Sequence, residues 1–297
     1  LGANITPQTR AIVMQYTFGL PAQMDRVMSI ADTSGIPVIE DCCHAIASTF
    51  DGVPLGAFGV ASFYSFEWGK PIVAGLGGAA VANEPELAER LATEWQNYPT
   101  PPMGKKLQLE LQFRAFKVLY HPRWYWYVRA AFHGLAATGA VAGNFAMPAA
   151  SVGPSPEYGW RMSPGLLRRL KRNVGSLDLV VQHSDRVVSQ YRQLLHGRNA
   201  VPPAVPSLGR PCYARYPLLV DNQQRLLAHA RENHIELADW YRTVIHPLAY
   251  DHQAAVHYEP ESCPNAEHRA RQIVSLPVNR QVDDRFLELA VEIVNYG

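Results

Sequence analysis

Asp41 and Lys70 each follow an apolar run typical of a buried strand, within residues 35–44 and 61–70. A lysine amine can hold the aldehyde of a cofactor as a Schiff base. A buried carboxylate beside a pyridine nitrogen keeps that nitrogen protonated, so that the ring accepts electrons from a substrate carbanion. The two residues together therefore predict a binding site for pyridoxal phosphate.

Lys70 would both anchor this cofactor and act in the reaction. Once an amino substrate displaces the lysine, the released amine lies near the substrate carbon and can move a proton there. Each residue alone has a simpler explanation, because a lysine after a strand is usually a surface charge and Asp is favoured at the start of a helix. The surrounding motif favours the cofactor site for both.

The elements around these residues predict an α/β core. Residues 11–18 form a short apolar run, residues 21–32 have helical spacing, and Gly35 suits a left-handed helix cap before a second apolar strand at residues 36–39. This order is typical of a βαβ unit with parallel strands. Because ligands of open α/β sheets bind at the carboxyl ends of strands, we expect Asp41, Ser65 and Lys70 to lie at one such edge.

Four motifs carry a resemblance to a known family. They are Ile39-Glu40-Asp41-Cys42-Cys43-His44, Gly56-Ala57-Phe58-Gly59, Ser65-Phe66-Glu67-Trp68-Gly69-Lys70 and Gly75-Leu76-Gly77-Gly78. The chain resembles the DegT/DnrJ/EryC1/StrS sugar aminotransferases. Further similarity lies in residues 6–19, 157–163, 264–267 and 275–277.

The resemblance implies a fold and an activity. The fold would be the type I fold of pyridoxal-phosphate-dependent transferases, and Asp41, His44, Ser65 and Lys70 occupy the positions that contact the cofactor in the family. The implied reaction moves an amino group from a donor, expected to be glutamate, to a keto sugar, expected to be nucleotide-linked, in polysaccharide or glycan biosynthesis. A homodimer is implied as well. Family members that dehydrate sugars lack this lysine, so Lys70 disfavours dehydration.

The sequence departs from the family at two places. The chain starts at a point that family members reach only after an upstream segment, which carries a Gly-Thr phosphate contact and an aromatic residue over the ring. Gly159 stands where the family usually has an Asn that reaches a partner's cofactor. The alternative hypothesis is therefore a truncated, non-catalytic homologue that serves as a binding or assembly subunit, although the complete set of four site residues favours an enzyme.

Composition favours a cytoplasmic enzyme of two domains. The chain has 297 residues, of which 47% are hydrophobic, and single cores seldom grow beyond about 250–300 residues. A net charge of +1 gives no signature of nucleic-acid binding. Cysteines stand at 42, 43, 212 and 263, which matches neither a zinc spacing nor a disulfide framework, so we expect a reducing compartment and no metal site. The first residues do not resemble a secretory signal.

We expect three segments along the chain. Residues 1–95 would be the remainder of the cofactor-binding large domain with a mostly parallel sheet, residues 96–156 a helical insertion, and residues 157–297 a long helix followed by a smaller α+β domain. The long helix is expected over residues 166–195, a strand over 213–220, and helices over 223–233 and 286–294. In the long helix, Arg168, Arg169, Lys171 and Arg172 are expected to form a solvated face.

The insertion is basic and aromatic. Helical spacing resumes at residues 107–120, and residues 105–130 carry six lysines and arginines together with the aromatic run 124–127. Two interpretations are open: the segment lies on a membrane surface, or it packs on its own domain or on a dimer partner. We favour packing, because aromatic helix faces are more often buried than bound to lipid.

Overall fold

The computed structural model describes residues 1–142, 159–246 and 248–296. It divides into two compact units, and both are discontinuous in sequence. The first unit combines Leu1–Glu110, Gly159–Ser184 and Ala204–Ala214, and the second combines Leu111–Tyr158, Asp185–Pro203 and Arg215–Gly297. The domain boundaries expected from the sequence, at residues 95 and 156, stay predictions.

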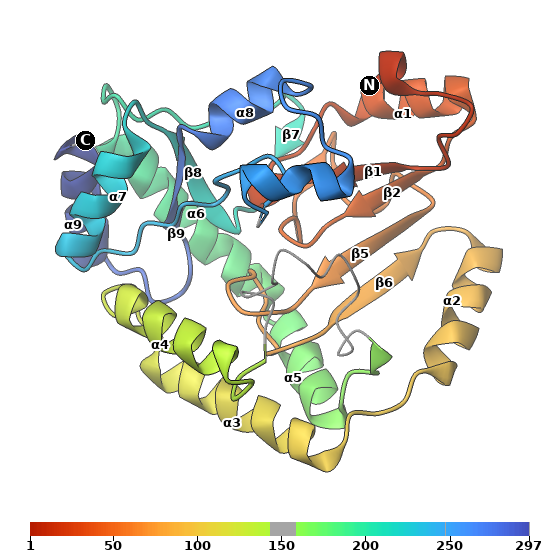
Figure 1. The fold of residues 1–297 in the computed structure, drawn as a ribbon, viewed down its shortest axis with the longest axis horizontal. Helices are drawn as coiled ribbons and strands as arrows, with labels where there is room; N and C mark the ends of the chain where they lie inside the picture. Colours follow the sequence, from red (N-terminus) through yellow and green to blue (C-terminus); the bar gives the residue numbers. More distant parts are fainter. Residues whose placement is uncertain (143–158, 247, 297) are drawn as a thin grey trace. The chain divides into compact units, whose positions relative to one another are not determined.

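A four-stranded sheet forms the centre of the first unit (Figure 1). Its strands are β1 (Ile12–Gln15), β2 (Val38–Asp41), β5 (Ala61–Ser65) and β6 (Gly78–Ala82), in the order β1-β2-β5-β6. The first three are parallel, and β6 runs antiparallel to β5. The predicted α/β class with a mostly parallel sheet is confirmed.

Helix α1 (Met24–Ser34) connects β1 to β2 and covers one face of the sheet. Its inward side chains Met24 and Ala31 are almost fully buried against residues of the two strands. Gly35 ends the helix with a φ of 63°, in the left-handed region that glycine adopts without a steric penalty. The predicted βαβ unit and its glycine cap are confirmed.

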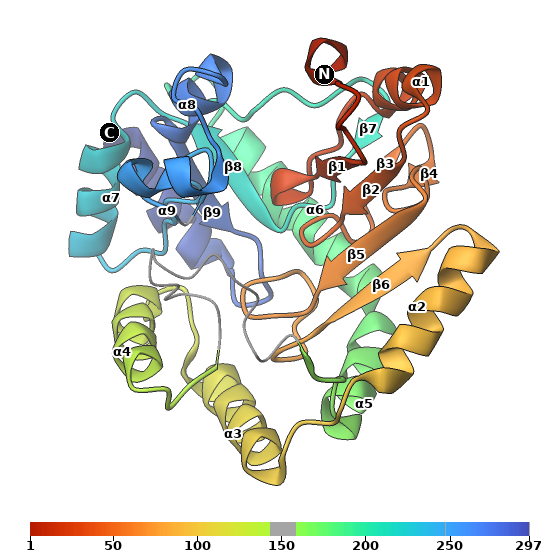
Figure 2. The ribbon, with the colours of Figure 1, turned by 45° about the vertical axis from the view of Figure 1, so that its right-hand side comes forward.

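The rest of the first unit supports this sheet. Helix α2 (Pro85–Asn97) follows β6, and a small antiparallel sheet joins β3 (Thr49–Phe50), β4 (Val53–Pro54) and β7 (Gly209–Arg210) (Figure 2). Short 3-10 turns occur at η1 (Gly2–Asn4) and η2 (Thr17–Gly19). The second of these turns leads from β1 toward the candidate site.

The prediction of one long helix over residues 166–195 is wrong in one respect, because the segment forms two helices. Helix α5 (Pro164–Val174) stops at Gly175, and α6 (Leu177–Leu194) begins two residues later. Ser176 donates its hydroxyl proton to the carbonyl of Asn173, 2.9 Å away. Glycine weakens a helix and serine offers the backbone a competing hydrogen bond, so the Gly-Ser pair ends the first helix.

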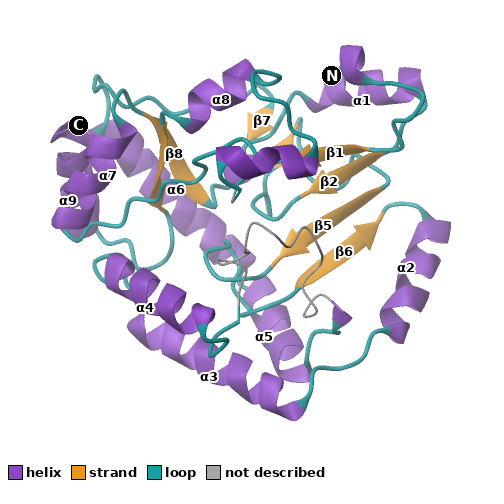
Figure 3. Cartoon of the chain, viewed as in Figure 1, coloured by secondary structure: helices purple, strands orange, loops and turns teal. Residues whose placement is uncertain are grey.

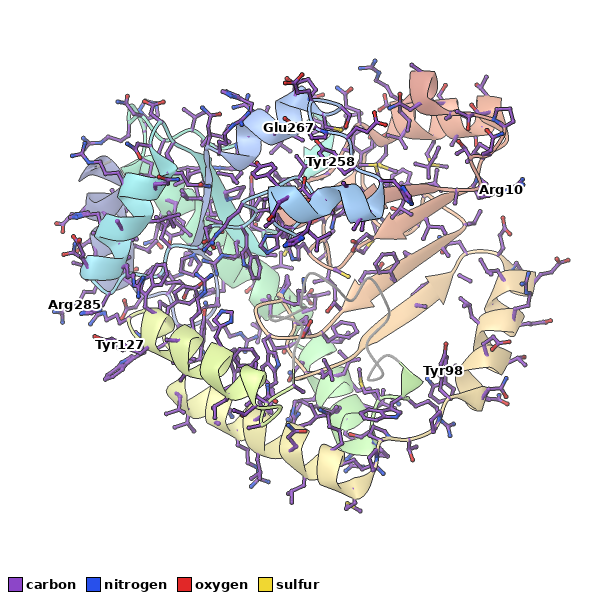
Figure 4. The ribbon with its side chains drawn as sticks, viewed as in Figure 1. Arg10, Tyr98, Tyr127, Tyr258, Glu267 and Arg285 are labelled. Carbon is purple, nitrogen blue, oxygen red and sulfur yellow. The ribbon has the colours of Figure 1, made fainter. Side chains whose placement is uncertain are left out.

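The second unit is built around an antiparallel strand pair (Figure 3). Strand β8 (Arg215–Leu219) pairs with β9 (Ile273–Pro277), and the helices are α7 (Gln223–Glu232), α8 (Pro264–Ala270), α9 (Asp284–Tyr296) and the 3-10 helix η4 (Tyr250–Val256). The strand predicted at 213–220 and the helices predicted at 223–233 and 286–294 are confirmed. In the family motif at 264–267, Glu267 accepts a hydrogen bond from the hydroxyl of Tyr258, 2.7 Å away (Figure 4).

The insertion contains helix α3 (Met103–Leu119), which was predicted, and helix α4 (Tyr125–Ala137), which was not. Within the second unit, Trp126 donates to the carbonyl of Ile235 at 2.8 Å, and the hydroxyl of Tyr120 bonds the carboxylate of Glu236. These contacts agree with the packing interpretation for part of the aromatic face, whereas Tyr127 stays 56% exposed (Figure 4).

Among the residues that the structure describes, no helix is both long enough and apolar enough to cross a bilayer. Residues 143–156 of the insertion, together with Glu157 and Tyr158 of the family motif, lie outside the described ranges.

Candidate active site

Lys70 lies in the turn that follows β5, and its amine contacts a histidine. The Nζ atom of Lys70 is 2.8 Å from Nε2 of His44. Gly69, with a φ of 78°, provides the left-handed backbone that the turn needs just before the lysine. Burial lowers the pKa of Lys70, and the neighbouring Cys43, Glu67 and Asp41 counteract this only in part. Because its pKa is lowered, the Lys70 amine loses its proton more readily than an exposed lysine does, and the uncharged amine is the nucleophilic form.

His44 follows β2 and is 5% exposed. The backbone N–H of Phe18 donates to its Nδ1 atom at 3.2 Å, and the ring of Phe18 lies 6.4 Å from the imidazole. The two ring nitrogens thus have separate partners, one on the turn after β1 and the other on Lys70. This fixes the orientation of the imidazole.

Asp41 ends β2, and both of its carboxylate oxygens accept hydrogen bonds. Oδ1 accepts from the backbone N–H of Cys43 at 3.0 Å, and Oδ2 accepts from the side-chain amide of Gln15 at 3.2 Å. Each carboxylate oxygen has two lone pairs, so these bonds orient the group and leave it able to accept from a further N–H donor.

Ser65 ends the neighbouring strand β5 and faces the same side of the sheet as Asp41. The parallel register pairs Asp41 with Phe63, and Ser65 is two residues further along, which returns it to that face. Its hydroxyl oxygen accepts a long hydrogen bond of 3.5 Å from the backbone N–H of Glu67. A hydroxyl that accepts in this way can still donate its proton. The structure therefore brings Lys70 and His44 into contact and places Asp41 and Ser65 on one face, at the carboxyl ends of the neighbouring strands β2 and β5.

Glu40 is a structural residue that the sequence analysis did not single out. It is fully buried, and its carboxylate accepts from the hydroxyl of Tyr16 at 2.5 Å. It also accepts from the backbone N–H groups of Gly56, Phe58 and Gly59 at 2.7–2.8 Å. Burial and the adjacent carboxylate raise the pKa of Tyr16, so its phenol stays a donor. The sequence did contain a signal for this role. Glu40 is an acid inside an apolar strand, and a buried carboxylate must have hydrogen-bond donors around it.

The segment after Lys70 is held by helix α5. Arg169 donates to the carbonyl of Ala74 at 2.8 Å and pairs with Glu110 at 2.5 Å, and the side-chain amide of Asn173 donates to the carbonyl of Val73 at 2.8 Å. Arg169 is 7% exposed, so its expected place on a solvated helix face is wrong. Only the tertiary fold brings the Ala74 carbonyl within its reach.

The cysteines beside the site are not activated nucleophiles. Burial is the largest cause that raises the pKa of both Cys42 and Cys43 to about 12, so that both thiols stay protonated near neutral pH. In the described part of the chain, no group of His, Cys, Asp or Glu side chains has the arrangement of a metal site.

The structure describes the motif at 157–163 from Gly159 onward, and neither Gly159 nor Arg161 contacts the four site residues in the described part of the chain. Gly159 has open space around the position of a Cβ atom. The guanidinium of Arg161 lies 5.2 Å from the ring centre of Trp95, and its backbone N–H donates to the carbonyl of Pro99.

The donor set fits pyridoxal phosphate. Lys70 offers an amine for the aldehyde, Asp41 a carboxylate for the ring nitrogen, and Ser65 a hydroxyl for the phosphate, while His44 is held beside the amine. The carboxylate retains acceptor capacity for an N–H group and the serine retains a donor, which are the capacities that the protonated ring and the phosphate need.

The comparison with protein families gives the same assignment. The sequence profile of the DegT/DnrJ/EryC1/StrS aminotransferase family matches residues 1–99 and 167–295. The chain belongs to this family. The gap in the match, residues 100–166, covers most of the insertion and contains α3 and α4.

Two relatives show how far the similarity extends. The UDP-N-acetyl-3-dehydro-alpha-D-glucosamine 3-aminotransferase of Acidithiobacillus ferrooxidans is 28% identical over 93% of this chain and 61% of its own length. The L-glutamine:scyllo-inosose aminotransferase of Streptomyces griseus is 40% identical, over 30% of this chain and 21% of its own length. The chain thus spans about three fifths of the first relative and a fifth of the second.

Solved structures of the family share the fold. DesV of S. venezuelae superposes with a TM-score of 0.72 at 22% identity, covering 99% of this chain and 67% of DesV. The putative sugar aminotransferase Spr1654 of Streptococcus pneumoniae, in its PLP form, gives a TM-score of 0.71 at 14% identity over 99% of this chain and 70% of its own. At these identities the likeness establishes the fold alone.

Proposed function

We propose that this family member is a pyridoxal-phosphate-dependent aminotransferase that converts the ketone of a nucleotide-linked sugar into an amine, with glutamate as the amino donor. The observation that carries the proposal is the half-buried amine of Lys70, 2.8 Å from His44 and in the same structural unit as Asp41 and Ser65. A lysine withdrawn from water in this way has little structural use, because burial disfavours its charge.

Each site residue has a proposed role. Lys70 would hold the cofactor through its aldehyde, Asp41 would accept a hydrogen bond from the ring nitrogen, and Ser65 would donate one to the phosphate. When bound, the cofactor supplies an electron sink for the pair of electrons left at the substrate carbon after its proton is lost. His44 orients Lys70 at the edge of this arrangement.

Lys70 would also move the proton. Once an amino substrate has taken its place on the cofactor, the lysine amine would be released beside the substrate carbon, and burial favours its uncharged form. An amine in this form would take the proton from the donor carbon in the first half of the reaction, and in the second half it would deliver a proton to the sugar carbon that receives the amino group. Since one group performs both transfers, its loss would stop both halves of the reaction.

The names of the two relatives suggest the substrates to test. The Acidithiobacillus relative acts, by its name, on a UDP-linked keto sugar, and it aligns with 93% of this chain. The Streptomyces relative, by its name, uses glutamine and a keto cyclitol, but it aligns with only 30%. We therefore favour a nucleotide-linked keto sugar, and we expect glutamate rather than glutamine as the donor. Polysaccharide or glycan biosynthesis would consume such an amino sugar.

We further propose a cytoplasmic homodimer that binds no nucleic acid. The net charge of +1 gives no basis for binding a polyanion, and none of the four cysteines, all of which the structure describes, forms a disulfide, as a reducing compartment would allow. A dimer is supported by the family relationship alone.

The test is covalent capture of the cofactor. The purified chain is mixed with pyridoxal phosphate and reduced with borohydride, and the modified peptide is mapped by mass spectrometry. We expect attachment at Lys70 and none in Lys70→Ala, whereas Lys117→Ala, which removes an exposed lysine of α3, leaves it unchanged. Attachment scattered over surface lysines would contradict the proposal and favour the alternative of a non-catalytic binding or assembly subunit.

A further inference from the structure

The two hydrogen bonds of His44 determine which of its nitrogens carries the proton. A backbone N–H can only donate, so the Nδ1 atom that faces the N–H of Phe18 must present a lone pair. A neutral imidazole with a lone pair on Nδ1 has its proton on Nε2. The atom that faces Lys70 is therefore an N–H donor.

This tautomer decides the state of the lysine. An ammonium group has three N–H donors and no lone pair, so it cannot accept from Nε2 at 2.8 Å. An uncharged amine can. We propose that His44 is a positioning residue that holds Lys70 as an uncharged amine, and that the backbone of Phe18 enforces this by selecting the tautomer of His44.

The turn that carries the Phe18 N–H is fixed in place. Phe18 has a φ of 60°, which is uncommon for a bulky residue, and Gly19 follows with a φ of 85°. A Cβ atom on Gly19 would lie 2.3 Å from the carbonyl oxygen of Cys212 and 2.8 Å from that of His44. Only glycine fits there, so the turn packs tightly against the segment that carries the histidine. The donor thus cannot easily rotate away from Nδ1.

The other groups around the amine act in both directions. The carboxylates of Asp41 and Glu67 and the thiol of Cys43 favour the ammonium form, while burial favours the uncharged form. The Nε2–H donor of His44 adds to the effect of burial, because it bonds only the uncharged amine. Asp41 can therefore serve the cofactor while Lys70, held by burial and by His44, stays an uncharged amine.

The consequence for function rests on the proposed cofactor. An uncharged amine attacks an aldehyde directly, whereas an ammonium must first lose a proton. The experiment does not need the cofactor, so the state of Lys70 can be tested even if the proposed activity is wrong.

The reactivity of Lys70 in the cofactor-free chain tests the proposal. Lysines are acetylated competitively over a range of pH, and the rates are read peptide by peptide by mass spectrometry, with the exposed Lys117 as the internal reference. A neutral hydrogen bond contributes about 0.5–1.5 kcal/mol, so His44→Leu should lower the reactivity of Lys70 near pH 8 about 3- to 10-fold. His44→Gln, whose amide can donate to the amine while its oxygen accepts from Phe18, should restore much of it.

A second measurement gives the tautomer itself. In protein labelled with ¹⁵N-histidine, the His44 signals, assigned by their loss in His44→Gln, should show the proton on Nε2. A proton on Nδ1, or a Lys70 that is equally or more reactive in His44→Leu than in the wild type, would overturn the proposal. If capture by borohydride fails while both measurements agree with it, the proposed cofactor site is wrong and this inference stands.

Discussion

Glu40 and Asp41 are adjacent on β2 and lie on opposite faces of the sheet. Glu40 points into the core, where it is fully buried and bonds Tyr16 and three backbone N–H groups. Asp41 points the other way, toward the side that also carries Ser65. Two identical charges one residue apart therefore have different tasks: Glu40 organises the strand ends, and Asp41 serves the site.

Replacing Glu40 with Gln should reduce stability. The amide has one acceptor oxygen where the carboxylate has two, so at least one of the backbone donors of residues 56–59 would lose its partner. Because a buried donor without a partner is costly, we expect Glu40→Gln to lower the unfolding free energy by about 2–4 kcal/mol. Urea denaturation measures this change. Glu89→Gln, on the surface of α2, is the control and should change it by less than about 0.5 kcal/mol. Equal stability of the two variants would show that the Glu40 bonds contribute little.

Asp41→Asn should separate cofactor attachment from catalysis. Lys70 is unchanged, so we expect borohydride capture to persist. The loss of a preorganised charge beside the ring nitrogen should lower turnover on the order of 100-fold or more. Asp51→Asn is the control, because Asp51 lies in an exposed turn with a φ of 50°, which asparagine also tolerates. Full turnover in Asp41→Asn would exclude the assigned role.

Arg168 and Arg169 form a matched pair on α5. Arg168 is exposed, whereas Arg169 is buried and bonds the carbonyl of Ala74 and the carboxylate of Glu110. Arg169→Leu should lower the unfolding free energy by about 1–3 kcal/mol and increase hydrogen exchange at residues 71–77, and Arg168→Leu should do neither. If both variants behave alike, α5 does not hold the segment after Lys70.

Local patterns were sufficient to predict the elements that depend on neighbours in sequence. The βαβ unit, the cap at Gly35 and the helix at 223–232 follow from apolar spacing and glycine chemistry, and the structure confirms them. The break at Gly175 was missed although its signal, a Gly-Ser pair, is local. Strand β9 was not predicted as a strand, because a short apolar run has no periodicity that distinguishes it.

The contacts between the site residues could not be predicted from the sequence. The motif indicated Asp41, His44, Ser65 and Lys70, but not that His44 would bond Lys70 or that Phe18 would donate to His44, since these partners are 26 residues apart in both cases. The burial of Arg169 depends on a carbonyl 95 residues away in sequence. Such partners are set by tertiary packing, which no local pattern encodes.

The second unit contains a buried ion pair that should be sensitive to truncation. Arg215 pairs with Glu236 at 2.6 Å, and neither side chain is more than 7% exposed. The hydroxyl of Tyr120 bonds the same carboxylate at 2.8 Å. Glu236→Leu leaves the Arg215 charge buried without its partner and should cost about 3–5 kcal/mol, while Tyr120→Phe should cost about 1–2 kcal/mol, both by urea denaturation.

The control for this pair is the exposed pair of Arg186 and Asp284, which are 3.3 Å apart and 49% and 75% exposed. Asp284→Asn should change the unfolding free energy by less than about 1 kcal/mol, because solvent screens such pairs. A cost in Glu236→Leu no larger than that in Asp284→Asn would mean that Arg215 finds another partner or reaches water.

The pH dependence of stability gives a measurement of Lys70 that needs no ligand. Burial lowers its pKa in the folded state below the ordinary value of 10.5, so between these two values the unfolded chain binds more protons than the folded one. The contribution of Lys70 to stability therefore rises with pH through that window and is lost as the pH falls. The unfolding free energy of the wild type minus that of Lys70→Met should increase up to about pH 10.5 and then level off. Lys117→Met, at an exposed position, should give a flat difference. A difference that decreases with pH would show that the folded protein favours the ammonium form, against both the burial of Lys70 and its bond to His44.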